Sequence, residues 1–109
     1  MRIFAGLLGF FVLIAAAMGQ TYPPKSGYVP DAKTAIAIAQ AVLIPVYGEK
    51  QIASEQPLHA SLKNNVWTVE GTLNCPDGKG GTTTRCNGGT ALVRISKIDG
   101  RILRMIHYQ

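Results

Sequence analysis

The sequence predicts an α+β domain in which one N-terminal helix packs on a four-stranded antiparallel sheet, closed by one disulfide. Three observations carry this prediction. An alanine-rich helical pattern follows Asp31, alternation of apolar and polar residues begins at Leu58, and two cysteines lie between the second and third predicted strands. We expect the helix to cover one face of the sheet, because neither element can bury its apolar side alone.

The first 19 residues read as a secretory signal peptide. Arg2 stands near the start, the apolar run is too short to span a bilayer, and Ala17 and Gly19 supply the small residues of a cleavage site. We therefore expect cleavage after Gly19, a periplasmic or secreted protein and no stable membrane insertion. An uncleaved N-terminal anchor is the alternative. Loss of Arg2 with the signal peptide lowers the formal net charge from +5 to +4. The remaining residues, 20–109, are enough for one small domain.

The domain is expected over residues 31–109, behind an extended, proline-rich lead-in at 20–30. Asp31 can cap a helix, since its carboxylate can accept hydrogen bonds from free N–H groups of the first turn. Pro45 is expected to kink or loosen the helix near Val42–Ile44, and Gly48 is expected to end it. Apolar residues at three- and four-residue spacing form one helix face: Ala35, Ile36, Ala39, Val42, Leu43 and Val46.

Four strands are expected after the helix, in two pairs joined by the short turns Asn64-Asn65 and Asp99-Gly100. The first three alternate apolar and polar residues, which predicts one buried face. Trp67 falls on that face and is assigned to the core. The last strand is apolar on both sides, so its inward set stays open. The predicted strands are 58–63, 66–73, 91–96 and 102–108.

Cys75 and Cys86 are expected to form a disulfide, because an even count in an exported chain favours pairing. Two free thiols would be expected only without export. The segment between them is rich in Gly, Thr and charged residues, which predicts a long exposed connection pinned at its base. On the chain-entropy model such a loop contributes about 3 kcal/mol.

The pattern of reactive side chains argues against catalysis. His59 and His107 lack metal-ligand spacing and are expected at the surface or the sheet edge. No nucleophile motif is present, and the six acidic residues are scattered over turns and polar faces, as solvated residues are. We therefore expect no catalytic residue, no metal and no cofactor. The dispersed basic residues and the predicted export argue against a nucleic-acid partner.

Several short motifs, in this order, resemble one family. They are GYVP at 27–30, an alanine-rich helix ending in PVYG at 45–48, VWTVEG at 66–71 and IDGRIL at 98–103. The chain resembles bacterial immunity proteins of polymorphic toxin systems, which have a nuclear transport factor 2-like (cystatin-like) fold. The resemblance implies a reduced, one-helix version of that fold and a non-enzymatic protein that binds and neutralises a cognate toxin.

The disulfide-pinned loop is the predicted contact with the toxin, because a preorganised loop loses less conformational entropy on binding. A tolerated insertion without a partner is the alternative. A periplasmic inhibitor of a lysozyme or protease is the alternative function. Tyr47 and Tyr108 are secondary contact candidates, since Tyr is favoured at interfaces, although core or edge packing would also explain them. The loop candidates are Lys79, Thr82, Thr83, Thr84 and Arg85.

Overall fold

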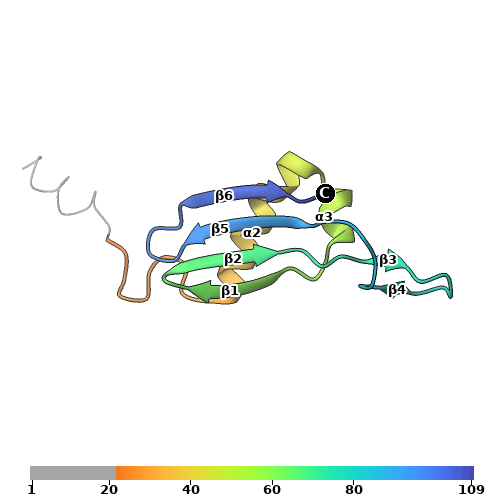
Figure 1. Cartoon of the computed structure of the whole chain (residues 1–109). Helices are drawn as coiled ribbons and strands as arrows, with labels where there is room; N and C mark the ends of the chain where they lie inside the picture. The colour runs from red at the N-terminus through yellow and green to blue at the C-terminus, as the bar shows by residue number, and fades with distance from the viewer. Residues whose placement is uncertain (1–21) are drawn as a thin grey trace, which may run out of the picture.

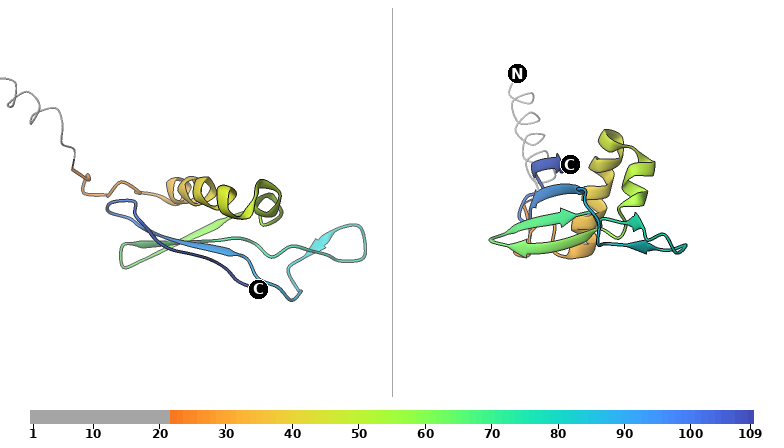
Figure 2. Two further views of the ribbon diagram at one scale, coloured as in Figure 1. Left: turned by 90° about the horizontal axis from the view of Figure 1, so that it is seen from above. Right: turned by 45° about the vertical axis from the view of Figure 1, so that its right-hand side comes forward.

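The computed structural model describes residues 22–109 and shows two layers (Figure 1). Two helices lie on one face of a four-stranded antiparallel sheet of order β1-β2-β5-β6. Among residues 22–109, no helix covers the other face (Figure 2), which we call the open face. The predicted α+β class is thus confirmed. The predicted signal peptide and its cleavage site lie outside the described residues.

The main helix, α2 (Ala32–Tyr47), begins as expected. The Asp31 carboxylate accepts a hydrogen bond from the Thr34 backbone N–H at 2.8 Å. The helix continues through Pro45 and ends at Gly48, whose φ of 96° suits glycine. A second helix, α3 (Glu49–Ser54), follows at once and was not predicted. Within residues 22–109, no helix is long and apolar enough to cross a membrane.

The four predicted strands are all present in the main sheet. The β1–β2 hairpin turns at Asn64 and Asn65, whose φ angles of 51° and 59° fit a tight two-residue turn. The β2 strand ends at Glu70, three residues earlier than expected. The strands are β1 (His59–Lys63), β2 (Val66–Glu70), β5 (Ala91–Ser96) and β6 (Ile102–His107).

The core lies between α2 and the sheet, and the predicted place of Trp67 in it is confirmed. The Trp67 ring N–H donates to the backbone carbonyl of Val29 at 2.8 Å. Val29 is fully buried, and its N–H donates to the Lys97 carbonyl, so the end of the lead-in is docked against the sheet. The buried cluster is Val29, Ala35, Ala39, Leu43, Ile52, Leu58, Trp67, Val69, Ala91, Val93 and Ile95.

The register decides which residues of β6 face inward. Met105 pairs with the buried Val93 and packs against the core, whereas Arg104 pairs with the exposed Arg94. A register shift between Arg94 and Ile95 marks an irregularity in the β5–β6 pairing. The apolar residues on both sides of this edge strand therefore do not indicate burial on both sides.

Candidate protein-binding surface

The segment between the cysteines forms a small arm beyond the end of the main sheet (Figure 1). Two-residue strands, β3 (Cys75–Pro76) and β4 (Thr82–Thr83), pair as a second antiparallel sheet. The Cys75–Cys86 disulfide closes the arm, with the two Cα atoms 6.4 Å apart, and this prediction is confirmed. We call residues 75–86 the disulfide arm.

Asp77 orders the tip of the disulfide arm. Its carboxylate accepts hydrogen bonds from the backbone N–H groups of Lys79 at 2.7 Å and Gly81 at 3.0 Å. These two bonds hold the pKa of Asp77 below its ordinary value of 3.8. The tip is therefore held in one conformation while Asp77 is charged.

Most of the predicted contact residues of the arm are accessible. Lys79, Thr82, Thr84 and Arg85 are exposed, whereas Thr83 is half-buried and accepts a hydrogen bond from the Arg85 backbone N–H at 3.1 Å. Within residues 22–109, neither the Lys79 ammonium nor the Arg85 guanidinium forms an ion pair. Both charged groups are free to bind a partner.

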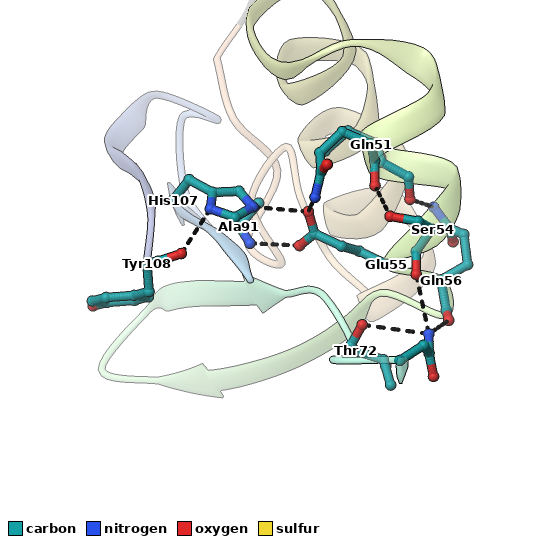
Figure 3. A network of polar contacts seen from close by, with 10 residues as sticks. Gln51, Ser54, Glu55, Gln56, Thr72, Ala91, His107 and Tyr108 are labelled. Atoms are coloured by element: carbon teal, nitrogen blue, oxygen red, sulfur yellow. Dashed lines mark hydrogen bonds and ion pairs between the residues drawn. The ribbon is translucent and has the colours of Figure 1, made fainter. Parts of the chain in front are cut away.

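Glu55 links the two chain segments that lead into and out of the arm (Figure 3). Its backbone carbonyl accepts from the Thr72 N–H at 2.7 Å, and its side-chain Oε1 accepts from the Ala91 N–H at 2.6 Å. The Glu55 side chain fills the space beside Gly71, where a Cβ atom would lie 2.5 Å from Oε1. Only 4% of the residue is exposed.

Asn74, the residue before the arm, is bound to the loop that follows α3. Its side-chain amide donates to the carbonyls of Ser54 at 3.2 Å, Gln56 at 2.9 Å and Thr72 at 3.4 Å. The Thr72 hydroxyl donates to the Pro57 carbonyl at 2.6 Å. The arm thus projects from a hydrogen-bonded base.

The other oxygen of Glu55 binds two side chains. Oε2 accepts from Gln51 Nε2 and from His107 Nε2, both at 3.0 Å. Burial raises the pKa of Glu55, but the hydrogen bonds from Ala91, Gln51 and His107 outweigh it and leave the pKa below 4.5. His107 Nδ1 faces the Tyr108 carbonyl at 2.8 Å.

Tyr47 and Tyr108 both neighbour His107, at the end of the sheet from which the arm projects. The Tyr47 ring centroid is 5.3 Å from that of His107, and Tyr47 is half-buried against the core. Tyr108 is 47% exposed, and its N–H donates to the Thr90 carbonyl at 3.1 Å. Tyr108 is thus the more accessible of the two, and the role of both in an interface stays a prediction.

The expectation that Glu55 is an ordinary solvated acid was wrong. Its partners Ala91 and His107 lie 36 and 52 residues further along the chain, so no local spacing could reveal the network. His107 lies on the edge strand as expected, but its ring is packed between Glu55 and Tyr47. Among residues 22–109, no three His, Cys, Asp or Glu side chains are grouped to hold a metal.

Fold and arm together define the class: a small helix-on-sheet α+β protein that presents an exposed, disulfide-closed arm. The family model described as NTF2 fold immunity protein matches residues 34–109, and the chain belongs to this family. Membership confirms the resemblance seen in the sequence and implies toxin neutralisation without catalysis. Comparisons with curated proteins and with solved structures gave no match.

Proposed function

We propose that this protein binds and neutralises a cognate toxin outside the cytoplasm, without catalysis, and that the disulfide arm forms part of the contact surface. Family membership supports the neutralising role. The observation that carries the role of the arm is its construction: an exposed segment, covalently closed by Cys75–Cys86 and fixed at its base by buried Glu55.

The physical argument for the arm is preorganisation. A loop that is already ordered loses less conformational freedom when a partner binds, so more of the interaction energy appears as affinity. Asp77 fixes the tip, and Lys79 and Arg85 offer cationic donors without an internal ion pair. The Gly and Thr residues between them are small enough to allow close approach of a partner.

The location outside the cytoplasm rests on two observations. Disulfides persist in oxidising compartments and are rare in the reducing cytosol, and residues 1–19 have the layout of a signal peptide. A protector must meet its toxin, so the target is expected in the cell wall or membrane rather than in cytoplasmic nucleic acid.

Co-expression tests this function and its compartment. A gene that neighbours this one and encodes an exported effector is taken as the candidate toxin. It is expressed with or without an export signal, together with the full chain or with residues 20–109 lacking a leader. We expect growth to be rescued when toxin and protector are both exported. Rescue only by the leaderless form would contradict the location, and no rescue in any combination would contradict the function. Inhibition of a purified lysozyme or protease, without rescue, would favour the inhibitor alternative.

Charge reversal tests the arm. The double variant Lys79→Glu/Arg85→Glu is compared with a matched control, Lys33→Glu/Lys50→Glu, which changes two exposed lysines on the helices. We expect the arm variant to bind the toxin at least about tenfold more weakly, because like charges then face the partner. The control should bind as the unchanged protein does, with equal circular dichroism for all three. Equal affinity of the two variants would exclude the arm from the contact.

A further inference from the structure

The open face of the main sheet carries a group of cations that the arm does not include. Alternation places Lys63 of β1, Arg94 of β5 and Arg104 of β6 on this face, away from both helices, and all three are exposed. Arg94 and Arg104 stand directly opposite each other in the β5–β6 register. We call these three residues the basic face.

Among residues 22–109, no residue of the basic face forms an ion pair, and Glu70 of β2 is the acidic side chain that alternation places on the same open face. Within residues 22–109 the ion pairs are Arg101–Asp99 and Glu55–His107, and neither includes a residue of the basic face. Like charges directly opposite on neighbouring strands destabilise a sheet. The Arg94–Arg104 pair is therefore a local cost to the fold that an acidic partner would relieve.

A shallow hollow beside this pair is lined by hydrogen-bond donors. It measures about 270 Å³ and is bordered by Lys63, Asn64, Val66, Thr68 and Arg94. Four of these five side chains can donate a hydrogen bond, and two of them are cations. Carboxylates accept such bonds, so the hollow has the size and chemistry to receive an Asp or Glu side chain.

We infer that the open sheet face, centred on Lys63, Arg94 and Arg104, docks an acidic patch on the cognate toxin. This inference rests on the proposed function and adds the charge of the partner's surface. Charge complementarity carries it: within residues 22–109, three exposed cations without an ion pair lie on one face of the sheet, against one acid, Glu70, at the other end of β2 from Lys63. A protein is favoured over nucleic acid because Trp67 points into the core, so among residues 59–70 and 91–107 no Phe, Tyr or Trp lies on this face to stack bases.

Three variants test the inference against the purified toxin that the co-expression experiment identifies. Arg94→Glu/Arg104→Glu reverses two charges of the basic face, and Arg104→Glu reverses one of them. The control, Lys33→Glu/Lys50→Glu, changes the net charge of the protein by the same amount as the first variant, but on the helices. Association rates are measured by surface plasmon resonance at about 20 and about 150 mM salt, because screening weakens exposed charge interactions over this range.

We expect the double variant of the basic face to associate at least about tenfold more slowly at low salt and to lose most of its salt dependence. The helix control should match the unchanged protein. Arg104→Glu creates an opposite-charge pair with Arg94, so it should melt at a higher temperature and still associate more slowly. This opposite movement of stability and binding separates a binding role from a structural one.

Three results would overturn the inference. If both double variants associate equally, the basic face is not the docking surface, while binding by the unchanged protein keeps the proposed function. If the unchanged protein neither binds nor protects, the function and the inference fall together. If reversal of the basic face abolishes binding to phosphatidylglycerol vesicles and leaves toxin binding unchanged, the face binds lipid headgroups instead.

Discussion

Replacement of Glu55 by Ala should remove a large share of the free energy of unfolding. The Ala91 N–H, which donates to Oε1 at 2.6 Å, would lose its acceptor in a buried setting, which costs about 1–3 kcal/mol. The 3.0 Å bonds from Gln51 and His107 would also be lost. His107 is 23% exposed, so water offsets part of that loss. We expect a total of about 3–4 kcal/mol, against about 5–10 kcal/mol for a domain of this size.

Gly71 provides a matched test of the same site. A Cβ at this position would lie 2.5 Å from Oε1, 3.3 Å from Cδ and 2.9 Å from Cβ of Glu55. Gly71→Ala should therefore cost about 1–3 kcal/mol through overpacking. In the Glu55→Ala background two of the three close atoms are gone, so the cost of Gly71→Ala should fall by about 1 kcal/mol.

The assay is urea unfolding followed by the fluorescence of Trp67, the single tryptophan of the chain, which is buried in the core. The four proteins of the Glu55/Gly71 cycle are compared at one pH and with the disulfide intact. A Glu55→Ala loss below about 1 kcal/mol would refute the assigned hydrogen bonds. Equal costs of Gly71→Ala in both backgrounds would refute the packing argument.

Three further predictions concern acid, the disulfide and the lead-in. The pKa of Glu55 is lowered in the folded protein, so the stability that its charge contributes is complete above about pH 5 and is lost as the pH falls through 4.5 and below. The difference in free energy of unfolding between the unchanged protein and Glu55→Gln should therefore shrink over that range, and a constant difference would contradict this. Cys75→Ser/Cys86→Ser should lower the free energy of unfolding in urea by less than about 3 kcal/mol, because the arm lies outside the core and can loosen without the rest of the domain. Unfolding of the whole double variant without urea would contradict this. Gly27→Ala should lower the melting temperature, since Gly27 has a φ of 80° and its Cβ would collide with the Lys97 carbonyl; an unchanged melting temperature would show that the lead-in is not docked.

Local sequence signals predicted most of the main fold. The Asp31 cap, the Asn64-Asn65 turn and the alternation around Trp67 each depend on residues close in the chain, and all three appear in the structure. The helix α3 was missed because six residues are too few to show a helical period. Within α3, Ile52 is buried against the core, which is a tertiary contact that local sequence does not reveal.

The site was predicted less completely than the fold. The disulfide followed from the cysteine count, and the exposure of Lys79 and Arg85 followed from the Gly-rich composition around them. The base of the arm could not be predicted, because Glu55 finds its partners across long separations and only after the sheet has formed. The Arg94–Arg104 pair likewise requires the β5–β6 register, which the irregularity at Ile95 shifts.

The two proposed contact surfaces should respond differently when the fold is weakened. Order in the disulfide arm depends on Glu55, since this residue binds both chain segments at the base of the arm. The basic face lies on strands whose backbones are bonded to one another, with Lys63, Arg94 and Arg104 held by register. A change at Glu55 should therefore loosen the arm while leaving the basic face ordered. Toxin binding by such a protein would lose the benefit of arm preorganisation and keep the salt-dependent attraction, because the first depends on entropy and the second on charge.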